Sequence, residues 1–424
     1  MGKKQGSGTT AIHGGKGPYD NALSTEPVVT PIYPSSTFAF DTVEDHQNSI
    51  FGDLVYPMYT RAASGNPTIR VLESRLAALY GAEAALATAS GMAAINYTLM
   101  HLLNPGDHVV MGRCYRLTHN IAQMILEQKM GVSITLMLSE NVKDLPKFLT
   151  DRTKVLMLDL PNNPLITVYD IEEAVKVAHE RGITVIVDDT CATPLNANAL
   201  DLGADIVACS LTKYMCGHGD AVGGAIVSNA DLVKDIRHGL YPRIGAAISP
   251  FNAWLVLQGL KTLHLRVPRH NQTTQALSEY LEGHPKVSRV NYPSLPSHPQ
   301  YELANRMMKG FGGMMSFVVK GGDEAATAMT NKLKIGKIGT SFGQAETMIE
   351  TGWMSHYEWS MEDRIRFGLY PGFIRVSPGL EDAEDLIADF EQALAQIDVD
   401  VNETLPEAPE EVELEWKPTI TTME

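Results

Sequence analysis

The sequence predicts an α/β protein with a large, mostly parallel sheet and a smaller C-terminal α/β domain. Between residues 84 and 210, six short apolar runs typical of strands alternate with segments typical of helices. These strands are apolar almost throughout, which favours a parallel sheet covered by helices on both faces. A second alternation of strands and helices follows residue 293 and indicates the smaller domain.

The elements of the large domain follow from hydrophobic periodicity and capping residues. A helix is expected to begin at Asn66 and Pro67, because asparagine caps helices and proline suits the first helical position. The predicted strands are 84–90, 107–112, 132–138, 154–160, 183–189 and 204–210. The predicted helices among them are 91–103, 119–129 and 171–182. Residues 250–282 are expected to form a long helical segment, interrupted near Pro268.

Composition changes along the chain suggest four segments. Residues 1–62 are rich in Pro, Gly, Ser and Thr and are expected to form an extended arm. Residues 63–260 then form the large, ligand-binding domain, and residues 261–400 form the small domain. Residues 401–424 are acidic and contain proline, which indicates a loosely attached tail.

Charge and cysteine content exclude some classes of partner. The chain has 34 basic and 50 acidic residues, a net charge of −16, which argues against nucleic-acid and anionic-membrane partners. No segment approaches the roughly 20 apolar residues of a membrane span. The four cysteines form no C-x-x-C pair, so we expect free, buried thiols in a reducing cytoplasm and no metal site.

Candidate functional residues stand directly after the apolar strands, because ligands of open α/β sheets bind at the carboxyl ends of strands. Ser90, Gly91 and Met92 follow the first strand and begin a helix, where backbone amides can bind an anion. Asp188 and Asp189 end a later strand and could bind a metal, a ribose hydroxyl or a protonated heterocycle, or could serve as capping or ion-paired residues. No G-x-x-x-x-G-K-[ST] loop supports a nucleotide-linked metal site.

Two cations complete this set. Lys213 follows the strand at 204–210, beside the hydroxyls of Ser210 and Thr212, and a lysine sheltered from water can act as a nucleophile or base. The alternative is a lysine that extends into solvent at a strand end. Arg375 is the single cation in an apolar run and suits a carboxylate ligand, unless it pairs with Glu381 or Asp382.

Together these residues are the set that pyridoxal 5'-phosphate requires. The cofactor needs a lysine for its aldehyde, an acid for its ring nitrogen and a cradle for its phosphate, and amino-acid substrates need a carboxylate clamp. The sequence therefore predicts a cofactor-dependent enzyme that acts on amino acids, and the lysine is expected at position 213.

At these residues the chain resembles the trans-sulfuration (Cys/Met metabolism) family of pyridoxal-phosphate enzymes, over almost its whole length. The segment DLGADIVACSLTKYMCGHGDAVGGAIV (201–227) is similar to the lysine signature of this family. Five more segments match in order: SGMAAI, NPGDHVV, DLPNNPLITVYDI, VIVDDT and IRVSPGLEDAEDLIADFEQAL. The resemblance implies the aminotransferase-like fold (fold type I), with a seven-stranded type of sheet. The family includes cystathionine γ-synthases, cystathionine lyases and methionine γ-lyases.

The resemblance also implies roles for individual residues. The catalytic residues implied are Lys213, Tyr115 and Tyr59. Lys213 would bind the cofactor aldehyde and shuttle protons, while Asp188 would face the ring nitrogen. The residues implied at the phosphate are Ser90, Gly91, Met92, Ser210, Thr212 and, from a neighbouring subunit, Tyr59 and Arg61. Tyr115 would stack on the ring and protonate a leaving group, and Asn163 would contact the ring hydroxyl. Arg375 and Ser341 would bind the substrate carboxylate, and the arm implies a homotetramer of active dimers.

The implied reaction is γ-elimination or γ-replacement on a homoserine-derived or sulfur-containing L-amino acid. Both outcomes use the same residues, so the motifs do not choose between them. The alternatives are a γ-lyase for a non-sulfur leaving group such as that of canavanine, a cystathionine β-lyase, and a catalytically idle homologue. A nicotinamide dehydrogenase is disfavoured because no G-x-G-x-x-G opens the first strand-helix turn.

Overall fold

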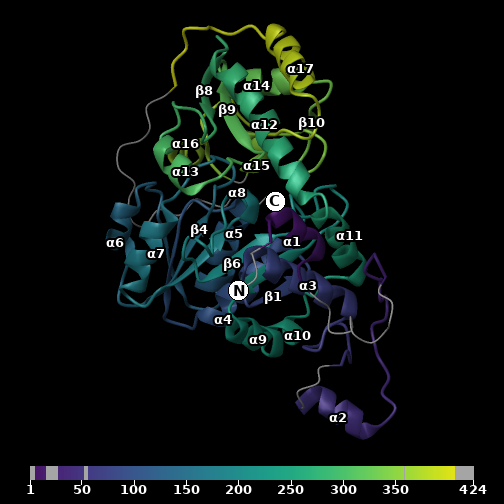
Figure 1. Cartoon of the computed structure of the whole chain (residues 1–424). Coiled ribbons are helices and arrows are strands. Elements are labelled where there is room, and N and C mark those ends of the chain that lie inside the picture. The colour runs from purple at the N-terminus through teal and green to yellow at the C-terminus, as the bar shows by residue number, and fades with distance from the viewer. Residues whose placement is uncertain (1–4, 16–26, 52–55, 358, 406–424) are drawn as a thin grey trace, which may run out of the picture. The chain divides into compact units, whose positions relative to one another are not determined.

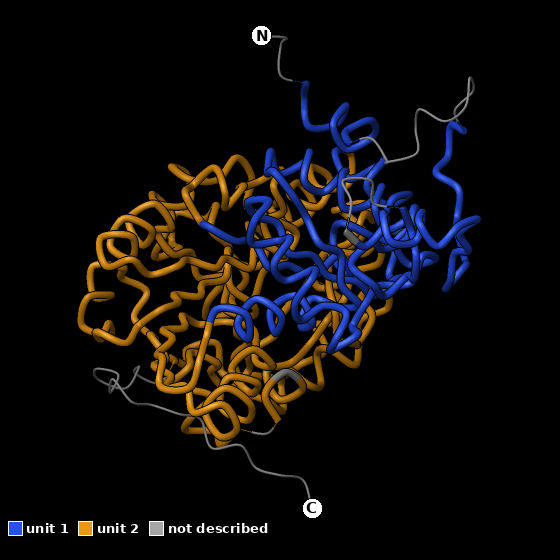
Figure 2. Tube along the Cα trace, turned by 90° about the horizontal axis from the view of Figure 1, so that it is seen from below, with its two compact units in different colours: residues 1–102, 205–264 blue, residues 103–204, 265–424 orange. Residues whose placement is uncertain are grey.

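The computed structural model of the chain describes residues 5–15, 27–51, 56–357 and 359–405. Within these ranges the chain forms two compact units (Figure 2). Unit 1 consists of residues 1–102 and 205–264, and unit 2 of residues 103–204 and 265–424. No helix in the described part is long and apolar enough to cross a membrane. The predicted boundaries at residues 62, 260 and 400 stay a prediction.

The described residues of unit 1 form three strands, flanked by helices (Figure 1). The strands are β1 (Ala84–Thr88), β6 (Ile206–Ser210) and β7 (Gly224–Ser228). Strand β7 lies between the other two and runs antiparallel to both. The helices are α1 (Ser7–His13), α2 (Val43–Phe51), α3 (Pro67–Tyr80), α4 (Gly91–Leu102), α9 (Ala230–His238), α10 (Leu240–Ile244) and α11 (Pro250–Leu260). Helices α3, α4 and α9 pack on the strands, so β1, β6 and β7 are almost entirely buried.

Helix α3 begins where the sequence predicts. The Asn66 side chain accepts a hydrogen bond from the Thr68 amide, and Pro67 occupies the first turn. The helix ends at Gly81, whose φ of 69° lies in the left-handed region that favours glycine. Its buried face includes Leu72, Leu76 and Glu73, which pairs with Arg237 at 2.8 Å.

Unit 2 carries a parallel group of strands in the order β5-β4-β2-β3. These are β2 (His108–Met111), β3 (Ser133–Leu136), β4 (Thr153–Asp159) and β5 (Thr184–Asp188). The helical segments along this part of the chain are α5 (Arg116–Ile121), the π-helical turn η1 (Ala122–Glu127), the 3₁₀ turn η2 (Val142–Asp144), α6 (Leu145–Phe148), α7 (Ile171–His179) and α8 (Thr193–Asn196). Strand β4 is buried from Val155 to its end, as expected for a central parallel strand.

A second sheet in unit 2 has the order β10-β11-β12-β9-β8 and is antiparallel except for the β10–β11 pair. Its strands are β8 (Val287–Asn291), β9 (Met315–Val319), β10 (Lys337–Ile338), β11 (Met348–Thr351) and β12 (Phe373–Ser377). The neighbouring helices are α12 (Leu263–Glu282), α13 (Tyr301–Met307), α14 (Gly322–Thr330), α15 (Gly352–Ser355), α16 (Met361–Phe367) and α17 (Ala383–Ala395). Apolar side chains of α12, α14 and α17 form one core with this sheet (Figure 1).

The seven strands β1–β7 and the separate five-stranded sheet confirm the predicted α/β fold class. Each of the six strands predicted before residue 211 is present. The seventh strand, β7, was not predicted as a separate element, although it ends the glycine-rich segment quoted above.

Two other predictions of secondary structure were wrong in detail. The segment 250–282 breaks at Lys261 and Thr262, whose amides bond to carbonyls three residues earlier, and the helix continues through Pro268. The arm predicted to be extended contains helices α1 and α2. Helix α2 follows a capping pattern that was overlooked, because the Thr42 hydroxyl accepts a hydrogen bond from the Asp45 amide.

Candidate active site

In unit 1, Ser210 ends β6, and Thr212 and Lys213 lie on the turn that follows it. Lys213 is half-buried, and its carbonyl accepts a hydrogen bond from the Gly217 amide at 2.7 Å. The Thr212 hydroxyl accepts a hydrogen bond from the Gly223 amide at 3.0 Å. These bonds fix the backbone on both sides of the lysine, so its amine extends from an ordered turn at a strand end.

The start of α4 lies against this turn, also within unit 1. The Ser90 hydroxyl caps the helix by accepting a hydrogen bond from the Ala93 amide at 3.1 Å. A Cβ added to Gly91 would lie 2.8 Å from the Ser210 Cβ, and one added to Gly224 would lie 2.1 Å from the Ser90 carbonyl oxygen. The helix start therefore packs on β6 and β7 with no room for a side chain at either glycine.

In unit 2, two carboxylates end neighbouring parallel strands. Asp159 of β4 and Asp188 of β5 are paired in register. Asp188 accepts hydrogen bonds from the Thr190 amide, at 3.0 Å, and from the Thr190 hydroxyl, and its side chain is half-buried. Asp189 is fully buried, and its carbonyl accepts a hydrogen bond from the Thr193 amide. Asp188 is therefore the more accessible member of the predicted pair.

Asp159 is a site residue that the sequence analysis missed. It is 4% exposed, and its carboxyl accepts a hydrogen bond from the Tyr115 amide at 2.9 Å. Burial, and then the charge of Asp188, raise the pKa of Asp159 well above its ordinary value. Asp159 ends an apolar strand just as Asp188 does, so the same strand-end rule would have identified it.

Tyr115 lies between β2 and α5, and its side chain is 37% exposed. Partial burial raises the pKa of its phenol, and the nearby charges of Arg116, Glu350 and Arg375 act on it in opposite directions. The phenol therefore keeps its proton at neutral pH and can donate it.

Arg375 lies on β12 and is almost fully buried, with three polar partners. Its guanidinium forms an ion pair with Glu350 at 2.5 Å and donates hydrogen bonds to the Asn163 side chain, at 3.1 Å, and to the Ser341 carbonyl, at 2.9 Å. Its Nε is buried without a hydrogen-bond partner. The structure thus brings the predicted residues Arg375, Asn163 and Ser341 together, and it leaves one donor position that an anionic ligand could fill.

The partner of Arg375 differs from the alternative considered from sequence. Glu381 instead accepts hydrogen bonds from Thr347, and Asp382 pairs with Arg269 at 2.8 Å. The actual partner, Glu350, lies opposite Arg375 in the β11–β12 register. This second missed residue had no sequence signal of its own, because a glutamate in a short strand is usually on the solvent face.

Tyr59 and Arg61 are on the surface of unit 1. Tyr59 is 39% exposed, and the Arg61 guanidinium lies 5.3 Å from the centre of the Tyr59 ring. Arg61 also donates a hydrogen bond to the Pro242 carbonyl. The phosphate of a neighbouring subunit remains a predicted ligand for this pair.

Comparison with known proteins defines the class. A crystal structure of metB from Corynebacterium glutamicum superimposes with a TM-score of 0.84 at 36% identity, over 92% of this chain and 98% of that one. The family model described as "Cys/Met metabolism PLP-dependent enzyme" matches residues 8–395. The fold and the family match are therefore those of a pyridoxal-phosphate enzyme.

Curated relatives agree with this class. An L-methionine gamma-lyase of Fusobacterium nucleatum subsp. polymorphum is 41% identical, over 93% of this chain and 99% of its own length. The chloroplastic cystathionine gamma-synthase 1 of Arabidopsis thaliana is 39% identical, over 92% of this chain and 69% of its own length. The chain belongs to the Cys/Met metabolism family of pyridoxal-phosphate-dependent enzymes.

The residues present fit the cofactor of this family. The close packing of Gly91 and Gly224 is compatible with a backbone cradle for a phosphate, and Lys213 carries the kind of amine that the cofactor aldehyde requires. Asp188 supplies an accessible carboxylate at a strand end, and the buried Arg375 supplies a donor for a carboxylate. The individual roles of these residues stay predictions.

Proposed function

We propose that the protein catalyses γ-elimination or γ-replacement on a homoserine-derived or sulfur-containing L-amino acid. The relatives named L-methionine gamma-lyase and cystathionine gamma-synthase support the reaction class, since both exceed 38% identity. The observation that carries the substrate class is Arg375, whose buried Nε has no hydrogen-bond partner beside the Asn163 and Ser341 contacts. A buried guanidinium with an unfilled donor suits the α-carboxylate of an amino acid.

In this proposal each residue has one task. Bound pyridoxal phosphate withdraws electron density from the substrate Cα, which makes the Cα and Cβ protons acidic. Lys213 holds the cofactor and carries protons between Cα and Cβ, while Asp188 faces the ring nitrogen. The phenol of Tyr115 donates its proton to the departing γ substituent, which its raised pKa allows at neutral pH. Arg375 orients the substrate through its carboxylate, and the Ser341 carbonyl holds the guanidinium in place by accepting a hydrogen bond from it.

The remaining site residues hold the cofactor. The phosphate is assigned to the helix start and to the strand-end hydroxyls: Ser90, Gly91, Met92, Ser210 and Thr212. Asn163 is assigned to the ring hydroxyl as well as to Arg375, with which it already shares a hydrogen bond.

A substrate panel tests the proposal. Purified holoenzyme is incubated with methionine, cystathionine, O-acylated homoserines and canavanine, each with and without an added thiol. Keto-acid release without thiol identifies elimination, and thioether formation only with thiol identifies replacement. Turnover of canavanine alone would assign a non-sulfur leaving group, and no turnover of any γ-substituted amino acid would refute the proposed reaction.

We also propose a cytoplasmic homotetramer built from active dimers. The exposed Tyr59 and Arg61 support a site completed by a neighbouring copy, and the four buried cysteines suit a reducing compartment. Light scattering of the purified protein measures its mass, and a monomer that is fully active would exclude a shared site.

A further inference from the structure

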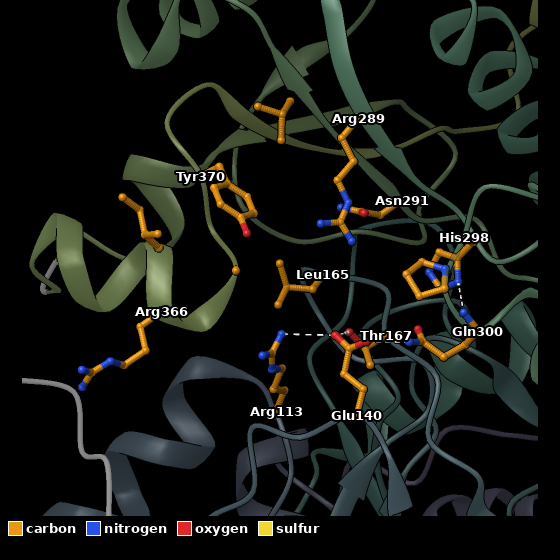
Figure 3. A pocket seen from close by; sticks show the side chains of 14 residues that line it. Arg113, Glu140, Leu165, Thr167, Arg289, Asn291, His298, Gln300, Arg366 and Tyr370 are labelled. Carbon is orange, nitrogen blue, oxygen red and sulfur yellow. Dashed lines mark hydrogen bonds and ion pairs between the residues drawn. The ribbon is translucent and has the colours of Figure 1, made fainter. Parts of the chain in front are cut away.

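Unit 2 contains a partly open cavity that none of the predicted site residues lines. This cavity has a volume of about 210 Å³ and lies among β8, α16 and the loops that follow β2 and β4 (Figure 3). That volume is below the roughly 300–1,000 Å³ of pockets for drug-sized ligands, so the cavity suits a small molecule.

The charged groups around the cavity are mostly cationic. Arg113, Arg289 and Arg366 line it, against the single carboxylate of Glu140. His298 also lines it, but burial lowers its pKa to about 4, so the ring is neutral at physiological pH. The lining therefore carries two more positive than negative charges.

The one carboxylate is already engaged. Glu140 accepts hydrogen bonds from Arg113 at 3.3 Å, from the Thr167 hydroxyl at 3.3 Å and from the Gln300 amide group at 2.5 Å. A ligand ammonium group would have to displace these bonds. An anion can bind without displacing the hydrogen bonds of Glu140. The lining therefore favours an anion over a zwitterion, which carries an ammonium group.

Donors without acceptors remain on two sides of the cavity. Arg289 forms no ion pair or side-chain hydrogen bond within the described ranges, and the Nε of Arg113 is buried without a partner. Figure 3 shows Arg289 and Arg113 reaching from opposite sides toward Leu165, with the Tyr370 hydroxyl directed into the same space. Arg366 points away from this space, so Arg289 supplies the main uncompensated charge.

We propose that this cavity binds a small organic anion, through a carboxylate or phosphate group held by Arg289, with its apolar part against Leu165. A guanidinium presents parallel donors that match either group in a bidentate geometry. The Tyr370 hydroxyl and the Arg113 Nε supply further donors to the same anion.

The cavity shares backbone segments with the active site, which makes the bound anion an effector. Arg113 precedes Tyr115 by two residues, and its amide bonds to the Tyr169 hydroxyl at 2.9 Å. Leu165 follows Asn163 by two residues. An anion that draws Arg113 and Leu165 together therefore acts on the segments that carry Tyr115 and Asn163.

Calorimetric titration of the holoenzyme with inorganic phosphate and with malonate, at constant ionic strength, tests the binding. The cofactor occupies the phosphate cradle in this form, so the remaining signal reports other sites. We expect Arg289→Gln to weaken binding of at least one probe tenfold or more, and Arg289→Lys to weaken it less. The matched control is Arg181→Gln, which removes an exposed positive charge of unit 2 outside the cavity.

The second readout is kcat/KM for the amino-acid substrate with and without the probe that binds. We expect a change of twofold or more in the wild type and in Arg181→Gln, and none in Arg289→Gln. If binding weakens equally in Arg289→Gln and Arg181→Gln, the loss is due to the lower net charge of the protein, and the proposed binding site is refuted. Binding that leaves kcat/KM of the wild type unchanged would overturn the effector role.

Discussion

Asp159 and Asp188 end adjacent parallel strands at the same register position, so two carboxyl groups lie at one edge of the sheet in unit 2. Two like charges so close, with Asp159 buried, cannot both be ionised at low cost. Asp159 is the one whose pKa is raised, and we therefore expect it to carry a proton in the folded protein. Its carboxyl oxygen accepts a hydrogen bond from the Tyr115 amide, and the oxygen of an asparagine side chain could accept the same bond.

The first prediction is that Asp159→Asn flattens the pH dependence of stability. The folded state raises the pKa of Asp159, so the folded protein binds more protons than the unfolded chain above about pH 4. Wild-type stability should therefore fall as pH rises from about 4 toward the raised pKa, by at most about 1.4 kcal/mol per pH unit from this group. Melting temperatures between pH 4 and 8 measure the difference, and parallel profiles of the two proteins would contradict the assignment.

The second prediction concerns the ion pair between Glu350 and Arg375. Both side chains are buried, so Glu350→Gln leaves a guanidinium without its counter-charge and should destabilise the fold by about 3 kcal/mol. A substrate carboxylate then meets no competitor at Arg375, and KM should fall. Urea unfolding and steady-state kinetics check the two parts. A variant that unfolds like the wild type and has a higher KM would show that Glu350 helps to bind the substrate.

The control for this pair is Glu381→Gln. Glu381 accepts two hydrogen bonds from Thr347, and the ion pair and hydrogen bonds of Arg375 within the described residues go to Glu350, Asn163 and Ser341. The Glu381→Gln variant should be less stable, because the bonds to Thr347 are weakened, but its KM should be unchanged. This comparison separates a loss of folding stability from an effect on Arg375.

The third prediction is that Gly224→Ala weakens cofactor retention. The added methyl would lie 2.1 Å from the Ser90 carbonyl oxygen, so the start of α4 must shift away from β7. Equilibrium dialysis should then show at least tenfold weaker binding of pyridoxal phosphate. Gly6→Ala is the matched control, because nothing lies within 4 Å of its added methyl and its φ is −67°. Equal affinity in both variants would mean that this packing does not shape the phosphate cradle.

The fourth prediction is that Lys213→Ala abolishes turnover without unfolding the protein. The side chain is half-buried on a loop whose backbone bonds do not depend on the amine, so circular dichroism and melting should remain close to those of the wild type. Borohydride treatment of the wild type should fix the cofactor on the peptide that contains Lys213. Cofactor fixed on another lysine, or activity retained by the variant, would refute the catalytic assignment.

The fold was predictable because its strands are buried on both faces. Strands such as β4 and β5 are apolar along most of their length, and the helices between them keep a regular period. Strand β7 was not predicted, because glycines precede it and glycine is typical of loops. The helix break was predicted near Pro268 because proline is a strong signal for a helix end. The helix tolerates Pro268, and the break lies at Lys261, which has no such signal.

Site residues were predictable where they follow an apolar strand. Their interaction partners were not predictable where these come from a distant part of the chain. Lys213, Asp188 and Arg375 each stand out from an apolar run. Glu350 pairs with Arg375 only through the register of β11 and β12, which sequence periodicity does not specify. The cavity around Arg289 could not be predicted for the same reason. Its lining residues, such as Arg113 and Arg289, come from segments more than 170 residues apart in the chain.

Ser341 holds Arg375 through its main-chain carbonyl, at a φ of 87° that few residues other than glycine adopt. Selection at this position therefore acts on the path of the chain as well as on the side chain. Glycine or asparagine could replace the serine and still aim the carbonyl at the guanidinium. Valine or isoleucine could not, so a homologue with a β-branched residue here would need another way to orient its arginine.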